Sequence, residues 1–216
     1  MTAPGDEAEL GLPGGAFAKL DPEEDELFYE PPRLVYHIDE HAVAVLTDFY
    51  RRVLPLGGVV LDLMSSWVSH LPPEIAYAEV IGHGMNPEEL AANPRLARWF
   101  VQNLNRDPAL PLANASVDAV TICVSVQYLQ RPVAVLREAA RVLRPGGIVA
   151  ISFSNRCFWT KAVAVWRALD DAGHARLVEQ YLQHAGFAAT ETHALSAWIE
   201  DEQDPLIAVV GSTPGT

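Results

Sequence analysis

Residues 132–153 read PVAVLREAARVLRPGGIVAISF, and this stretch decides the fold. Pro132 suits the first turn of a helix, because that position needs no backbone N–H donor. The apolar residues that follow recur at three- and four-residue steps and share one helix face: Val133, Leu136, Ala140 and Leu143. The run 145–147, Pro-Gly-Gly, ends the helix, and the apolar, β-branched residues 148–153 then predict a buried strand. The stretch therefore indicates a helix–turn–strand unit of an α/β protein.

The same alternation extends outward along the chain. Residues 117–124, VDAVTICV, are almost all apolar and β-branched, as expected of a central strand covered on both faces of a parallel sheet. Further strands are predicted at residues 59–63, 78–81, 187–194 and 206–210. Helices are predicted after the caps Asp39 and Asn86, over 94–101, and over about 160–169 and 175–185. The pattern indicates a single Rossmann-like, doubly wound α/β domain with a mainly parallel sheet.

The start of the chain is strongly acidic. Nine acidic residues stand between Met1 and Glu30 against the single basic residue Lys19, and the whole chain has a formal net charge of −13. We expect residues 1–28 to form an acidic, flexible arm and residues 29–216 to form the domain. A net charge of this sign repels phosphate backbones, so nucleic acid is not an expected partner.

Composition limits the class of protein further. No run of about 18 apolar residues indicates a membrane span, and no basic stretch leads into an apolar one as in a secretory signal, so we expect a cytoplasmic protein. The only cysteines are Cys123 and Cys157, with no second pair to complete a metal site. Cys123 lies in an apolar run and is expected to be a buried small hydrophobic residue.

Four segments in order resemble the class I S-adenosylmethionine-dependent methyltransferases, type 11-like: residues 59–63, 110–120, 138–147 and the closing strand pair. The resemblance implies a seven-stranded sheet whose last strand is antiparallel, with S-adenosyl-L-methionine across the carboxyl ends of the first strands. A narrower resemblance, to methyltransferase-like proteins of bacteria and plastids, rests on residues 28–39, 65–72 and 152–158. That group shares the unusual first turn Ser-Ser-Trp-Val-Ser-His.

Two cofactor contacts of the larger family are altered in this sequence. The family's three glycines after the first strand fall on Met64, Ser66 and Val68. The acid that would bind the ribose hydroxyls at the end of the second strand falls on Gly84. Asn86 is the nearest replacement for that acid, although it also has the position of a helix N-cap.

The resemblance and the position of the strand ends together imply a set of cofactor contacts: Arg33, Asp62, Met64, Ser65, Ser66, Met85, Asn86, Asn105, Cys123 and Val124. Arg33 could pair with the methionine carboxylate or with the acidic arm. The adenine contact is expected from the loop that holds Asn103, Asn105 and Asp107.

Methyl transfer from a sulfonium needs alignment more than a fixed catalytic motif. His37 is the candidate general base, because it precedes a helix that covers the cofactor in related proteins; the alternative is that it merely precedes the Asp39 cap. The candidate substrate contacts lie after the first, fourth and fifth strands: Trp67, His70, Tyr128 and Asn155.

The sequence thus predicts a methyltransferase that transfers a methyl group from S-adenosyl-L-methionine to a small-molecule acceptor. The alternative is a non-catalytic methyltransferase-like protein that keeps the fold for binding or assembly. A nicotinamide-dependent oxidoreductase is disfavoured, because no G-x-G-x-x-G follows any predicted strand. Neither the methyl acceptor nor the oligomeric state is encoded in a recognisable motif.

Overall fold

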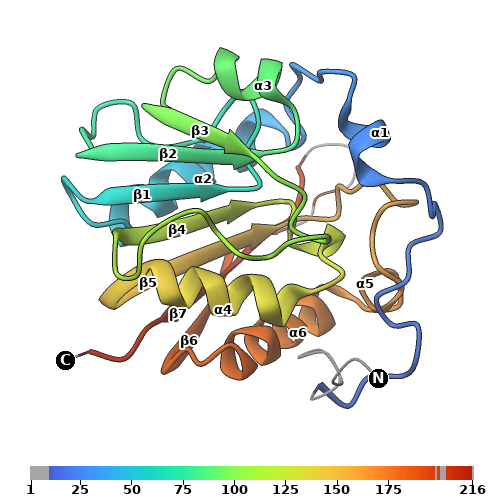
Figure 1. The fold of residues 1–216 in the computed structure, drawn as a ribbon. Helices are drawn as coiled ribbons and strands as arrows, with labels where there is room; N and C mark the ends of the chain where they lie inside the picture. The colour runs from blue at the N-terminus through green and yellow to red at the C-terminus, as the bar shows by residue number, and fades with distance from the viewer. Residues whose placement is uncertain (1–9, 198, 200–202, 216) are drawn as a thin grey trace.

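The computed structural model describes residues 10–197, 199 and 203–215. Seven strands form one sheet in the order β3-β2-β1-β4-β5-β7-β6 (Figure 1). Their bounds are β1 Val59–Leu63, β2 Glu79–Gly84, β3 Arg98–Val101, β4 Val117–Cys123, β5 Leu143–Phe153, β6 Ala189–Ser196 and β7 Leu206–Ser212. Strand β7 is antiparallel to both of its neighbours, whereas β1 to β5 pair in parallel. The predicted seven-stranded sheet with an antiparallel last strand is confirmed.

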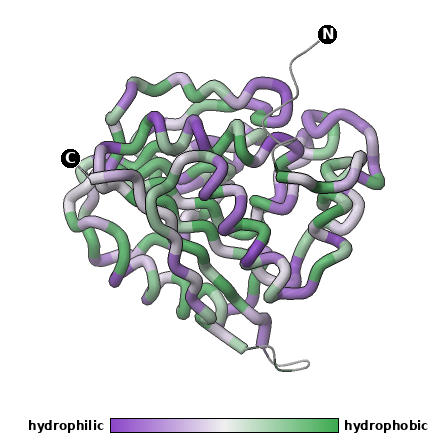
Figure 2. Tube along the Cα trace, turned by 90° about the horizontal axis from the view of Figure 1, so that it is seen from below, coloured by the Kyte–Doolittle hydropathy of each residue, from purple (hydrophilic) through white to green (hydrophobic). Residues whose placement is uncertain are grey.

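Helices cover both faces of this sheet: α2 Glu40–Val53 packs on one face, and α4 Pro132–Val142 and α6 Asp171–His184 pack on the other (Figure 1). The side chains of β1 alternate accordingly. Val60 joins the apolar cluster of α2, whereas Leu61 and Leu63 join the cluster of α4 and α6. Figure 2 shows hydrophobic segments running through the middle of the molecule. A strand buried on both faces reads as a continuous apolar run, which explains the sequence of β4.

The shorter helices lie around the carboxyl ends of the strands: α1 Asp25–Tyr29, α3 Pro87–Ala92, α5 Ala164–Arg167 and a 3₁₀ turn over Val126–Tyr128. The predicted caps are confirmed. Asp39 accepts a hydrogen bond from the Ala42 N–H at 2.7 Å, and Asn86 caps α3.

The predicted helix over residues 94–101 is wrong, because Arg98–Val101 forms edge strand β3. This strand pairs with β2, with Arg98 opposite Ile81 and Val101 opposite Gly84. Aromatic and β-branched residues favour a strand where a neighbouring edge is open, and that edge is not visible in the sequence. Helix α5 is also shorter than predicted, since the backbone N–H groups of Ala164 and Val165 bond to the N-terminal segment instead.

The described part of the acidic N-terminal segment, residues 10–28, lies against the domain, where the sequence predicted a flexible arm. Lys161 is fully buried, donates to the Glu23 carbonyl at 2.8 Å and lies 3.0 Å from the Asp21 carboxylate. Lys19 pairs with Asp25 at 2.6 Å. Buried lysines therefore balance part of the acidic charge. Residues 1–9 lie outside the described residues, and the domain boundary at residue 29 stays a prediction.

Replacing Leu61, which has no exposed surface, should destabilise the domain strongly. We expect Leu61→Ala to lower the free energy of unfolding by about 2–5 kcal/mol, because it leaves a cavity between β1 and α4. The matched control Leu56→Ala removes a side chain that is 77% exposed and should change the stability by less than about 0.5 kcal/mol. Urea unfolding followed by circular dichroism measures both. Equal losses in the two variants would contradict the placement of Leu61.

Candidate functional site

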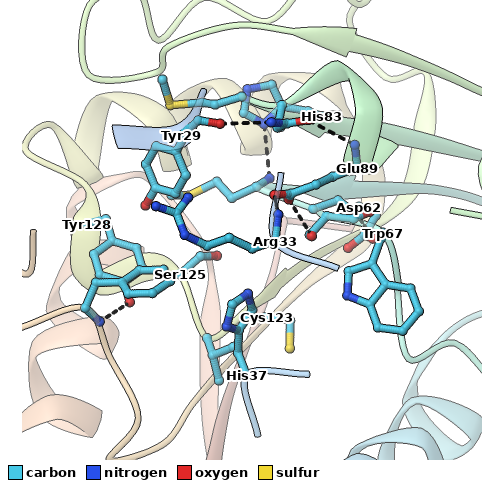
Figure 3. A pocket seen from close by; sticks show the side chains of 18 of the residues that line it. Tyr29, Arg33, His37, Asp62, Trp67, His83, Glu89, Cys123, Ser125 and Tyr128 are labelled. Carbon is cyan, nitrogen blue, oxygen red and sulfur yellow. Dashed lines mark hydrogen bonds between the residues drawn. The ribbon is translucent and has the colours of Figure 1, made fainter. Parts of the chain in front are cut away.

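A cavity of about 360 Å³ lies beyond the carboxyl ends of β1, β2 and β4 (Figure 3). Residues 25–37, which contain α1 and are called the covering segment below, form one side of it. It is lined by fourteen of the residues singled out in the sequence: Arg33, His37, Asp62, Met64, Ser65, Ser66, Trp67, His70, Met85, Asn86, Asn105, Cys123, Val124 and Tyr128. The fold brings these residues together because parallel strands end at one edge of the sheet. Their individual roles stay predictions.

The turn after β1 is built from hydrogen bonds in place of the family's glycines. Met64 has a φ of 59°, the left-handed conformation that a glycine adopts most easily. Its N–H donates to Nδ1 of His83 at 3.0 Å, and the Ser65 N–H donates to the His83 carbonyl at 2.6 Å. The Ser65 hydroxyl donates to the Asp62 carboxylate at 2.5 Å. Side chains at the ends of β1 and β2 therefore fix this turn.

His83 acts as a neutral clamp between three strands. Its Nδ1 accepts from Met64, so Nε2 carries the proton and donates to the Gln102 carbonyl at 3.0 Å. Burial lowers the pKa of His83 to about 4. The imidazole thus stays uncharged and joins the turn after β1 to the chain that follows β3. No sequence pattern marks His83 as a site residue.

Gly84 lies where the family places its ribose-binding acid, and the structure explains why an acid is absent. A Cβ atom at Gly84 would lie only 2.6 Å from the carbonyl oxygen of Ser65. The backbone of the first turn therefore occupies the space that a side chain at position 84 would need. The altered glycine turn and the missing acid are therefore linked, because the Ser65 carbonyl of the turn lies against Gly84.

Asn86, the predicted replacement for the acid, has its side chain engaged within the protein. Its Oδ1 accepts from the Glu88 and Glu89 N–H groups at 2.9 and 3.0 Å. Its Nδ2 donates to the carbonyls of Tyr29 and Glu30 at 3.0 and 2.9 Å. Asn86 therefore both caps α3 and holds the covering segment over the cavity.

Asn105, the candidate adenine contact, is engaged in a similar way. Its Nδ2 donates to Asp25 at 2.9 Å and to the Tyr128 carbonyl at 3.0 Å, and its Oδ1 accepts from the Gln130 N–H at 2.7 Å. The side chain ties the loop after β3 to the 3₁₀ turn after β4 and to α1. It lines the cavity but shapes it through protein contacts.

Glu89 is a buried carboxylate at the cavity that the sequence analysis did not single out. Its Oε1 accepts from the Arg33 N–H at 2.7 Å, and its Oε2 accepts from the Ser66 hydroxyl at 2.6 Å (Figure 3). Each oxygen keeps a further lone pair. In the sequence this residue is simply an acid in the first turn of a helix, and only its burial distinguishes it from the exposed Glu88.

Arg33 crosses the middle of the cavity in Figure 3. Its guanidinium donates to the Phe28 carbonyl at 2.8 Å and lies 4.4 Å from the Phe28 ring centre and 5.5 Å from that of Phe158. These contacts come from the covering segment and from the loop after β5. The rings of Phe28 and Phe158 therefore hold the guanidinium at the cavity.

Asn155, a predicted substrate contact, does not line the cavity and is exposed. The turn after β5 is closed by a hydrogen bond from the Arg156 N–H to the Ser154 hydroxyl at 2.9 Å. Residues 156–158 face the cavity beyond this turn. Tyr128 holds the same loop, because its hydroxyl oxygen accepts from the Phe158 N–H at 2.8 Å.

Backbone strain concentrates at this cavity, and two buried polar atoms without a partner also belong to residues that line it. Among the described residues, four non-glycine residues have a positive φ, and the cavity is lined by three of them: Met64, His70 and Val124. Two cavity-lining side chains have a buried polar atom without a hydrogen-bond partner, the Ser125 hydroxyl and Nδ1 of His70. Such features cluster where a ligand completes the site.

Burial shifts the pKa of four side chains at the cavity, two histidines, Asp62 and Cys123, toward the neutral form, and it raises the pKa of Asp62. Burial lowers the pKa of His70 to about 4 and lowers the pKa of His37 as well. It raises the pKa of the Cys123 thiol to about 12, although this side chain, predicted to be buried, is partly exposed. Among the described residues no cluster of His, Cys, Asp and Glu could hold a metal ion, and no helix has the length and apolarity to cross a bilayer.

Comparisons with known proteins agree with this geometry. Residues 65–151 match the family model of the methyltransferase domain. A malonyl-[acyl-carrier protein] O-methyltransferase of Methylococcus capsulatus is 38% identical over 85 residues, which cover 37% of this chain and 31% of that protein. The corresponding enzyme of Hahella chejuensis is 31% identical over 135 residues, covering 60% of this chain and 47% of that protein. The matches thus span less than half the length of these curated relatives.

Among solved structures, the [4+2]-cyclase SpnF superposes with a TM-score of 0.64 and 15% sequence identity. The superposition covers 86% of this chain and 90% of that one. At this identity the likeness concerns the fold alone.

Gly84→Ala should destabilise the protein, because the added Cβ meets backbone that cannot rotate away. We expect a loss of about 1–3 kcal/mol, measured by urea unfolding. The control Gly14→Ala adds a Cβ with no atom within 4 Å and should have little effect. A Gly84→Ala variant as stable as the wild type would contradict the close approach of the Ser65 carbonyl.

His83 should make the stability depend on pH. Its folded pKa of about 4 lies below its unfolded value, so it stabilises the fold fully only above about pH 6.5. Its contribution, roughly 3 kcal/mol, should disappear as the pH falls from about 6.5 to 4. Substitution by the neutral amide in His83→Gln should flatten this part of the stability curve, measured by urea unfolding at several pH values. An unchanged dependence of stability on pH in the variant would contradict the neutral state of the buried His83.

Proposed function

This chain belongs to the class I S-adenosylmethionine-dependent methyltransferases, and from this premise we propose that it transfers a methyl group from S-adenosyl-L-methionine to a small-molecule acceptor. The observation that carries the proposal is the cavity at the carboxyl ends of β1, β2 and β4, where the strained residues Met64 and Val124 and the unpartnered Ser125 hydroxyl meet. Open α/β sheets bind ligands at this edge. A volume of about 360 Å³ lies within the range of small-molecule sites.

The side chains around the cavity fit the chemistry of the cofactor. S-adenosyl-L-methionine supplies an electrophilic methyl group on a sulfonium, and it also carries an ammonium, a carboxylate and two ribose hydroxyls. Arg33 would pair with the carboxylate, and the unpartnered Ser125 hydroxyl would donate to it. Asp62 would favour the cationic end, because it lies at the end of β1 beside the first turn.

Glu89 would accept the ribose hydroxyls in place of the acid that cannot fit at Gly84. It is the buried carboxylate beside the first turn, and its two oxygens accept one hydrogen bond each from Arg33 and Ser66. The remaining lone pairs are those that a pair of hydroxyl donors needs. A carboxylate on α3 would thus bind the ribose hydroxyls in place of an acid at the end of β2.

The residues of this chain would promote transfer mainly by alignment and by exclusion of water. Holding two reactants in line can lower a barrier by about 7–11 kcal/mol in the best-oriented cases. Asn86 and Asn105 fasten the covering segment and α1 over the cavity, which shields it from solvent. His37 and His70 line the cavity as neutral imidazoles, so either can accept the proton of an acceptor hydroxyl.

One observation favours the second candidate function, a methyltransferase-like binding protein without catalysis. The Ser65 carbonyl fills the place of the usual ribose acid, so the most recognisable cofactor contact is absent. The two candidates differ in whether the cavity takes the adenosyl group, which a binding measurement decides.

Calorimetric titration with S-adenosylhomocysteine tests the proposal directly. We expect the wild type to bind it and Glu89→Gln to bind about 10–100-fold more weakly, because hydrogen bonds to a charged acceptor are lost. The control Glu88→Gln changes an exposed acid one position away and should bind as the wild type does. No binding to the wild type up to millimolar concentration would overturn the methyltransferase proposal. Equal affinity in Glu89→Gln would overturn only the role of Glu89.

A further inference from the structure

Aromatic and histidine rings form two walls at the mouth of the cavity. One wall consists of Tyr36, Trp67 and His70, with ring centres 4.9 Å apart for Tyr36 and Trp67 and 6.0 Å apart for Tyr36 and His70. The other consists of His37, Phe158 and Tyr128, with Phe158 5.5 Å from His37 and 5.8 Å from Tyr128. All six side chains line the cavity.

The first wall is held in place by contacts from both sides. The Trp67 indole donates to the Val35 carbonyl at 3.0 Å, which ties the first turn to the covering segment. The neighbouring residues Tyr36 and His37 contribute to different walls, so the covering segment crosses the mouth between them. A space bounded by ring faces and edges favours a flat, apolar ligand over a flexible chain.

His70 has two properties that a purely structural residue would not need. Its backbone has a φ of 53° and is fixed there by a hydrogen bond from the Thr47 hydroxyl to its carbonyl at 3.0 Å. Its side-chain Nδ1 is buried without a partner, although the ring lines the cavity. Strain and an unpartnered ring nitrogen in one residue point to a ligand atom that this nitrogen binds.

The protonation state of His70 determines which kind of ligand atom its ring can bind. A neutral imidazole offers one nitrogen acceptor, which fits an O–H donor. Burial and the nearby His37 lower the pKa of His70, so the imidazole remains neutral near pH 7. The charged groups that also line the cavity have partners within the protein or are assigned to the cofactor. Arg156 pairs with Asp204 at 2.8 Å, Asp25 pairs with Lys19, and Asp62 accepts from Ser65 and Thr121. Arg33 and Glu89 are the groups proposed to bind the cofactor.

We propose that the space between the two ring walls binds a planar aromatic hydroxyl compound, with its hydroxyl donating to Nδ1 of His70. The proposal deepens the proposed methyl transfer by naming the acceptor class, and it rests on that function. In the reaction the acceptor oxygen forms a bond to the methyl carbon as the carbon–sulfur bond breaks. The sulfur keeps the electron pair and becomes a neutral thioether, and the hydroxyl proton passes to Nδ1 of His70.

The test measures binding of three probes of similar size: 2-naphthol, its methyl ether 2-methoxynaphthalene, and the non-planar alcohol decahydro-2-naphthol. Calorimetry or the intrinsic tryptophan fluorescence of the protein reports binding, with and without saturating S-adenosylhomocysteine. We expect 2-naphthol to bind about tenfold more tightly than either of the other two, because the ether lacks the donor and the saturated alcohol lacks the flat ring. Binding of the three probes with equal affinity, or no binding of 2-naphthol, would overturn the proposal.

Two variants separate hydrogen bonding from general damage to the cavity. His70→Asn removes the imidazole but suits the left-handed backbone, and it should abolish the preference for 2-naphthol over its ether. The control His41→Asn changes an exposed histidine on α2 and should preserve the preference. A His70→Asn variant that keeps the preference would overturn the proposal. If S-adenosylhomocysteine binds while 2-naphthol does not, the acceptor class fails and the proposed methyl transfer stands.

Discussion

The contact between the turn after β1 and the end of β2 determines the geometry of the whole cavity. His83 receives the Met64 N–H on one ring nitrogen and donates from the other to the chain after β3, and Ser65 bonds to the His83 carbonyl. Three consecutive strand ends are thereby joined through one neutral side chain. Because the Ser65 carbonyl then faces Gly84, the space next to β2 is filled by backbone, and the carboxylate of this region comes from α3.

Much of the fold follows from local patterns in the sequence. The helices α2 and α4 and the strands β1 and β4 were predictable because their apolar spacing, caps and terminating turns all agree. Strand β3 was not, because Arg98–Val101 forms a strand only through pairing with β2, a neighbour distant in sequence. The packing of the N-terminal segment was not predictable either. It depends on the buried Lys161, and a lysine in the sequence gives no sign that it is buried.

The candidate site was predictable in its position but less so in its details. Strand ends mark the residues that surround a ligand in this fold, so the predicted site residues other than Asn155 gather at one cavity. The role of each side chain depends on the hydrogen-bond partners that the fold places next to it. Asn86 and Asn105 use their amides to fasten neighbouring segments, and Glu89 becomes a cavity carboxylate only because it is buried. Hydrogen-bond competition of this kind has no signature in residue spacing.

The double use of the Asn86 side chain has a consequence for the exchange of ligands. Its oxygen caps α3, whereas its nitrogen holds the carbonyls of Tyr29 and Glu30. The two tasks use different atoms, and the covering segment is held besides by the bonds from Arg33 to Glu89 and from Trp67 to Val35. The segment could therefore lift by breaking these side-chain contacts while α3 keeps its cap. Entry and release of a ligand would then need no local unfolding of α3, which carries Glu89. The part of the cavity that α3 forms would stay preorganised while the covering segment moves.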